Sequence, residues 1–81
     1  MKLPRDVSAD RLIHLLGEYG YSVTRQTGSH IRLSSNYKSS THHITIPHHN
    51  PLNIGTLSGI ISEIAIYLEM DRADLIDKLF K

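Results

Sequence analysis

One stretch decides the fold of this chain: Tyr21-Ser22-Val23-Thr24-Arg25-Gln26-Thr27-Gly28-Ser29-His30-Ile31-Arg32-Leu33-Ser34. Polar and apolar residues alternate on both sides of its centre, which is typical of two antiparallel strands joined by a tight turn. Gly28-Ser29 suits such a turn because glycine tolerates a positive φ. The turn delivers His30 to the first residue of the second strand, at a sheet edge that a ligand can reach. Imidazole is the side chain that exchanges protons near neutral pH, so His30 is the first candidate for chemistry.

Each strand is expected to have one apolar and one polar face, because successive side chains of a strand point to opposite sides. The inward residues are Tyr21 and Val23 in the first strand, and Ile31 and Leu33 in the second. The outward residues are Ser22, Thr24 and Gln26 in the first strand, and His30, Arg32 and Ser34 in the second. The outward face therefore carries hydrogen-bonding groups and almost no acids.

A third strand is expected at His42–Ile46, after a polar loop over residues 35–41. Its two isoleucines point inward, and His43 and Thr45 point outward. Pro47 ends the strand because proline has no N–H to donate to the ladder.

Helices are expected before and after the sheet, with Ser8 and Asp71 as N-caps and Gly20 as the residue that ends the first. The second begins near Gly55 or Thr56. The three helices cover about residues 8–20, 55–68 and 71–80. The chain is thus predicted to be an α+β protein. Its order is α-β-β-β-α plus a short C-terminal helix, with a three-stranded antiparallel sheet and both main helices on one face. Residues 1–81 are expected to form a single domain.

Charge is unevenly distributed along the chain. Residues 1–50 hold six Lys or Arg and all six histidines against three acids, whereas residues 51–81 hold three Lys or Arg against five acids. The first part is therefore suited to an anionic partner, of which nucleic acid is the commonest. Cysteine is absent, and neither a signal peptide nor an apolar run of membrane-spanning length is found. We expect a soluble, cytoplasmic protein that does not enter a membrane.

The sequence resembles the HicA (YcfA-like) toxins of bacterial toxin–antitoxin pairs over about residues 10–68. The motifs that carry the resemblance occur in the same order and spacing: Leu15-Leu16-Gly17-Glu18-Tyr19-Gly20-Tyr21, Arg25-Gln26-Thr27-Gly28-Ser29-His30, Ile44-Thr45-Ile46-Pro47-His48-His49 and Gly55-Thr56-Leu57. Two features differ from the family pattern. The polar loop over residues 35–41 replaces a tight Asp-Gly turn, and Ile54 stands where a basic residue often precedes Gly-Thr-Leu.

The resemblance implies a fold like that of double-stranded-RNA-binding domains. It also implies a type II toxin, an mRNA interferase that cleaves messenger RNA, inhibits translation and is neutralised by a HicB-like antitoxin. His30 matches the catalytic histidine of the family. In that role, His30 would remove the proton of the RNA 2′-hydroxyl, whose oxygen attacks the adjacent phosphorus without a metal. Arg32 would stabilise the charge of the transition state.

Further RNA contacts are expected from residues of the same polar surface. These are Arg25, Gly28, Ser29, Arg32, Lys38, His43 and His49. The acid that protonates the leaving oxygen is not assigned, and His43 and His49 are its two candidates. No cofactor or resident metal is expected, and the oligomeric state stays open.

Three alternatives to this function remain open from the sequence. The pairs His42-His43 and His48-His49, with His30, could supply a zinc or nickel site. The domain could bind RNA without cleaving it, or it could be an interaction protein whose basic face meets an acidic partner. His30 itself could merely make a capping hydrogen bond at the strand edge.

Overall fold

The computed structural model describes residues 2–81 of the chain. Its elements are helix α1 (Ala9–Leu16) with a 3₁₀ turn η1 (Gly17–Tyr19), strands β1 (Ser22–Thr27), β2 (His30–Ser35) and β3 (His42–Pro47), and helices α2 (Ile54–Leu68) and α3 (Arg72–Leu79). This order confirms the predicted α+β class and the topology of double-stranded-RNA-binding domains.

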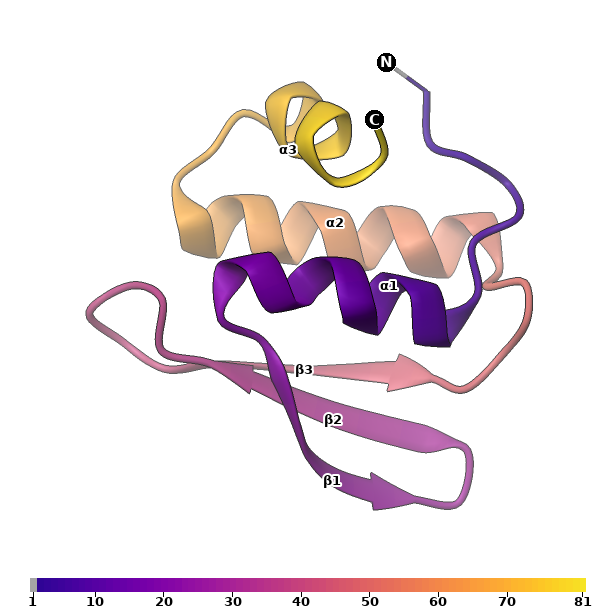
Figure 1. The fold of residues 1–81 in the computed structure, drawn as a ribbon. Helices are drawn as coiled ribbons and strands as arrows, with labels where there is room; N and C mark the ends of the chain where they lie inside the picture. The colour runs from indigo at the N-terminus through magenta and orange to yellow at the C-terminus, as the bar shows by residue number, and fades with distance from the viewer. Residues whose placement is uncertain (1) are drawn as a thin grey trace.

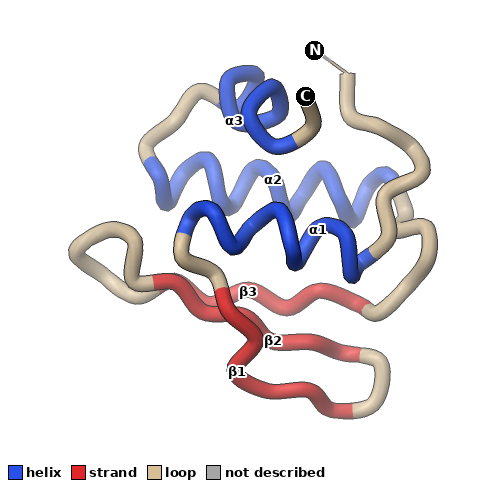
Figure 2. The backbone as a smooth tube through the Cα atoms, viewed as in Figure 1, coloured by secondary structure: helices blue, strands red, loops and turns tan. Residues whose placement is uncertain are grey.

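The elements form layers, with the sheet at one side of the molecule (Figure 1). The strands are antiparallel in the order β1-β2-β3, so β2 is central and the other two are edges. Helices α1 and α2 cover one face of the sheet, and α3 lies on the far side of α2 (Figures 1 and 2). No helix or strand of the described residues covers the opposite face of the sheet, which we call the open face.

The helices begin where side chains can bond to their first free N–H groups. Ser8 Oγ accepts from Arg11 N–H (3.1 Å), and Asp71 Oδ1 accepts from Ala73 N–H (2.8 Å), which confirms both predicted N-caps. Helix α2 begins slightly earlier than predicted, at Ile54, because Asn53 Oδ1 accepts from Gly55 N–H (2.9 Å).

The core lies between the sheet and the two main helices. The residues that the pattern predicted to face inward from the second and third strands, Ile31, Leu33, Ile44 and Ile46, are all buried. They meet buried leucines and isoleucines of α1 and α2, each of which contributes roughly 1.5–3 kcal/mol of burial. Among residues 2–81, none of the helices has both the length and the apolar character that crossing a membrane requires.

The face prediction for the first strand holds for Thr24, whose hydroxyl lies 3.4 Å from Ser34 Oγ, and is wrong from Arg25 on. The pairing register shifts between Val23 and Arg25, so that Arg25 pairs with Arg32 and Gln26 pairs with Ile31. Such a bulge adds one residue to the strand and changes which side each later residue faces. Gln26 is therefore on the helix side of the sheet, whereas Arg25 is on the open face.

Candidate functional site

The open face is organised as rows of side chains across the three strands. Antiparallel partners lie on the same face, so the register defines the rows. The first row is Thr27, His30 and Pro47, the second is Arg25, Arg32 and Thr45, and the third is Ser22, Ser34 and His43. His30 and the two arginines thus occupy adjacent rows.

The turn before His30 has the geometry that its sequence predicts. Gly28 has φ of 57°, and Ser29 has a negative φ, which matches the hairpin turn with glycine at its first central position. The turn is also tied to the end of β3, because His48 N–H donates to the Ser29 carbonyl oxygen at 2.6 Å. The backbone before His30 is therefore held both by the hairpin turn and by the bond to the end of β3.

The imidazole of His30 is exposed. Within residues 2–81 it makes no side-chain hydrogen bond, so the capping interaction considered from the sequence has no partner there. An imidazole that makes no hydrogen bond within the protein can bind a ligand without first breaking one.

The rows around His30 are positively charged. Strands β1, β2 and β3 contain no Asp or Glu, and the ion pairs among residues 2–81 join Lys38 to Glu69 and His48 to Asp10. Arg25 and Arg32 are thus cross-strand neighbours of like charge without a carboxylate partner, an arrangement that destabilises a sheet. A bound phosphate would relieve this repulsion through charge-assisted hydrogen bonds.

His43 lies in the third row, away from His30. Its Nδ1 is 2.6 Å from Ser34 Oγ, which in turn is 3.4 Å from Thr24 Oγ1. Ser34 follows His30 by four residues on β2, so the rise per residue separates His43 from His30 by about 13 Å. A phosphate at His30 is therefore out of direct reach of His43.

His49 follows the end of β3, and this end of β3 lies beside His30 at the start of β2. Pro47 pairs with His30, and a tight backbone bond from His49 N–H to the Pro47 carbonyl oxygen (2.9 Å) turns the chain directly afterwards. The side chain of His49 is exposed. Its neighbour His48 instead reaches Asp10 of α1, with 3.1 Å between Nε2 and Oδ1.

The other predicted RNA contacts are divided between the two ends of the sheet. Gly28 and Ser29 form the turn beside His30. Lys38 belongs to the loop at the opposite end, where its Nζ is 3.0 Å from Glu69 Oε1. The structure does not bring Lys38 to His30.

The histidines do not assemble into a metal centre. Within residues 2–81, no three His, Cys, Asp or Glu side chains lie close enough together to hold an ion. The zinc interpretation combined His43 with either His48 or His49, and His43 and His48 are held at different places by Ser34 and Asp10.

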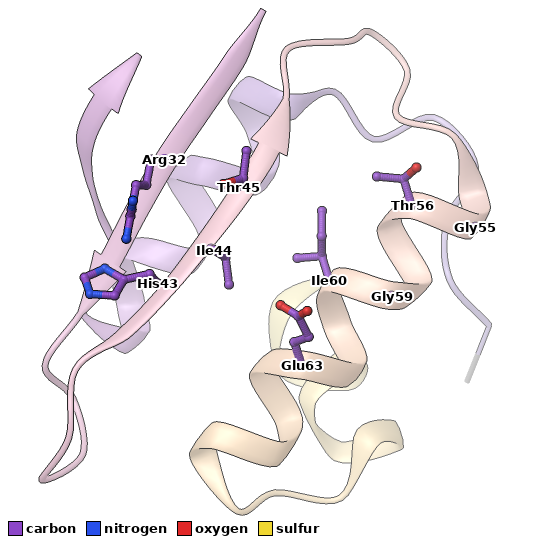
Figure 3. Close-up of a pocket in the computed structure, with 9 residues that line it drawn as sticks. All are labelled: Arg32, His43, Ile44, Thr45, Gly55, Thr56, Gly59, Ile60 and Glu63. Carbon is purple, nitrogen blue, oxygen red and sulfur yellow. The ribbon is translucent and has the colours of Figure 1, made fainter. Parts of the chain in front are cut away.

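The sequence pattern did not single out one acidic residue that lies beside the edge of β3. Glu63 of α2 lines a groove with Arg32, His43 and Thr45, and Figure 3 shows its side chain pointing from the helix toward β3. It lies outside the apolar stripe of its helix, so the sequence pattern indicated only a solvated charge.

Comparison with known proteins identifies one family. The family model described as HicA toxin of bacterial toxin–antitoxin matches residues 9–66, which is more than half of the chain. No significant match was found among curated proteins or solved structures.

Proposed function

Because the chain belongs to the HicA toxin family of bacterial toxin–antitoxin systems, whose members are known ribonucleases, we propose that it is a metal-independent endoribonuclease of messenger RNA. His30 is the general base of this reaction. The observation that carries the proposal is the exposed, unbonded imidazole of His30 in the row next to Arg25 and Arg32. These residues combine a proton acceptor with two phosphate-binding groups.

The reaction uses a nucleophile that RNA itself supplies. Neutral His30 takes the proton of the 2′-hydroxyl, and the 2′-oxygen forms a bond to the adjacent phosphorus. The bond from phosphorus to the 5′-oxygen breaks, leaving a 2′,3′-cyclic phosphate and a free 5′-hydroxyl. Arg32 neutralises the charge that grows on the phosphoryl oxygens, an effect of the kind worth about 10²–10³-fold when one donor is removed.

The leaving 5′-oxygen requires a proton, and His49 is better situated than His43 to supply it. His49 follows Pro47, the cross-strand partner of His30, whereas His43 pairs with Ser34 about 13 Å along the strand. We therefore expect His49→Gln to slow cleavage more than His43→Gln. Single-turnover rates on one RNA measure the difference, and a larger loss in His43→Gln would contradict this assignment.

The biological setting follows from family membership. The family implies a toxin whose partner is an antitoxin, and we propose a HicB-like antitoxin for this chain. Cleavage of messenger RNA would inhibit translation in the cytoplasm until that partner binds.

The deciding experiment compares the wild-type protein with His30→Ala on a long RNA, with and without a chelator. His30→Ala is expected to lower the cleavage rate by about 10²–10⁴-fold, the usual contribution of a general base. The matched control is His14→Ala, which makes the same change at an exposed position of α1. Products of the wild type are expected to end in a 2′,3′-cyclic phosphate.

Three results would contradict the proposal. Equal cleavage by the wild type and His30→Ala would remove His30 from catalysis. Cleavage that stops with a chelator would show a metal requirement. RNA binding without cleavage by either protein would favour the non-catalytic RNA-binding module.

A further inference from the structure

Strand β3 has an edge that no other strand of residues 2–81 covers. It is the last strand of the sheet, and within these residues it pairs only with β2. The bond from His48 N–H to the Ser29 carbonyl oxygen identifies which residue pairs of this ladder are hydrogen-bonded. Bonded and non-bonded pairs alternate, so the backbone groups of Ile44 and Ile46 point to β2. The N–H and C=O groups of His43 and Thr45 therefore point outward.

A groove follows this edge. His43, Ile44 and Thr45 line it from β3, and residues of α2 line the other side. Figure 3 shows Ile60 and Glu63 pointing across it toward the strand. Two of the α2 positions are glycines, Gly55 and Gly59, and a Cβ at Gly59 would meet nothing within 4 Å. One side of the groove thus has unpaired backbone groups, and the other side, at the two glycines, has little side-chain volume.

We propose that an extended segment of the antitoxin adds to β3 as a fourth strand and occupies this groove. The proposal rests on the proposed function in one respect, because family membership supplies the antitoxin as partner. Outward N–H and C=O groups are the requirement for strand addition, in which the backbone provides affinity and alternate side chains provide specificity.

The groove also specifies the chemistry of the added strand. Its open-face rim carries Arg32 and His43, so side chains pointing to that side are expected to be Asp or Glu. Side chains on the alternate positions enter the space beside Gly59 and Ile60, which suits small apolar residues. Glu63 on the helix wall favours a Lys or Arg at one end of the segment.

Strand addition would also explain how the partner silences the enzyme. An acidic side chain over Arg32 occupies the place of an RNA phosphate, while His30 lies two residues along β2 and stays outside the groove. Antitoxin and RNA would then compete for Arg32 without any contact between the antitoxin segment and the catalytic imidazole.

The test measures binding of the purified antitoxin encoded beside this gene to variants carrying His30→Ala. In this background no cleavage step enters the measurement, so failure of the ribonuclease proposal leaves the binding result interpretable. Gly59→Leu fills the groove, and Gly59→Ala is its matched control. Thr45→Pro removes one outward N–H that β2 does not use, and Thr45→Val keeps that N–H.

We expect Gly59→Leu and Thr45→Pro each to raise the Kd by about tenfold or more, as loss of a central contact does, and the two controls to bind like the parent. Circular dichroism verifies that each variant is folded. In cells, Gly59→Leu with His30 intact is expected to stay toxic when the antitoxin is co-expressed.

Three outcomes would overturn the proposal. Unchanged antitoxin affinity in both Gly59→Leu and Thr45→Pro would exclude the groove as its site. A dimer of the chain alone that Gly59→Leu dissociates would assign the edge to a second copy. Loss of affinity for a single-stranded RNA oligonucleotide, with antitoxin affinity kept, would assign the groove to nucleic acid.

Discussion

Arg25 and Arg32 form a pair whose position lowers the stability of the fold. They are direct cross-strand partners on the open face, and no carboxylate of β1, β2 or β3 separates their charges. Like charges in such a pair cost stability, and this cost supports the proposal that the two arginines bind a phosphate. The bulge at Thr24 creates this pair, because a regular strand would have turned Arg25 to the other face.

This arrangement predicts opposite effects on stability and on binding. Arg25→Ala is expected to raise the free energy of unfolding by about 0.2–1 kcal/mol through loss of the repulsion. The same change is expected to weaken RNA binding and to reduce its salt dependence by about one phosphate contact. Urea unfolding and RNA titrations at several salt concentrations measure the two effects.

Lys38→Ala is the control for this prediction. Lys38 is paired with Glu69 at the far end of the sheet, so its loss is expected to leave the salt dependence of binding nearly unchanged. An equal loss of RNA affinity in Lys38→Ala and Arg25→Ala would contradict the proposed location of the phosphate site.

Helix α2 and the turn after η1 show how glycine has different effects in different elements. Gly59 lies inside α2 with ordinary helical geometry and with open space where a Cβ would stand, whereas Gly20 has φ of 78° and ends the first helical segment. A Cβ at Gly20 would lie 3.1 Å from Ser35 Oγ. The first glycine is therefore replaceable, and the second is required.

Gly59→Ala is expected to stabilise the protein by about 0.4–1 kcal/mol, because alanine restricts the unfolded chain and fits the helix. Gly20→Ala is expected to destabilise it by about 1–2 kcal/mol, the cost of the left-handed conformation for a residue with a Cβ. Urea denaturation measures both. A stabilised Gly20→Ala would show that the turn can be rebuilt around a right-handed residue.

At the scale of the whole molecule, buried tyrosines make the stability of the fold depend on pH in the alkaline range. Burial is the main cause that raises the pKa of Tyr21 far above its usual value, with smaller contributions from Tyr67 and Glu63. Its hydroxyl lies 2.7 Å from His42 Nδ1, and the ring of Tyr67 stacks on that imidazole. The folded protein therefore keeps this phenol neutral when the unfolded chain ionises it.

Stability is accordingly expected to fall as the pH rises above about 10, the unfolded pKa of tyrosine. Above that pH the native state holds a proton that the unfolded state has lost, which costs up to about 1.4 kcal/mol per pH unit. Tyr21→Phe is expected to flatten this decline, whereas Tyr37→Phe, at an exposed ring, is not. Urea unfolding midpoints measured between pH 8 and 11 test this prediction. Equal declines of stability with pH in both variants would contradict the assignment of the effect to Tyr21.

Local periodicity was sufficient to predict the elements of the fold. The faces of β2 and β3, the N-caps Ser8 and Asp71, and the tight turn at Gly28 were all correct, because each depends on backbone geometry over a few neighbouring residues. The position of His30 at the start of the second strand, with its side chain exposed, was predictable for the same reason. The identity of the family followed from motifs that are likewise local.

Tertiary structure decided what depends on distant partners. The bulge that turns Arg25 toward Arg32 arises from how β1 packs against β2, and strand alternation alone predicts the wrong face for the residues after it. Glu63 comes to face β3 only because α2 crosses back over the sheet. Sequence by itself thus determined the elements and the exposed histidine, since these obey short-range periodicity. The register between strands and the groove beside β3 were decided by packing among residues far apart in the chain.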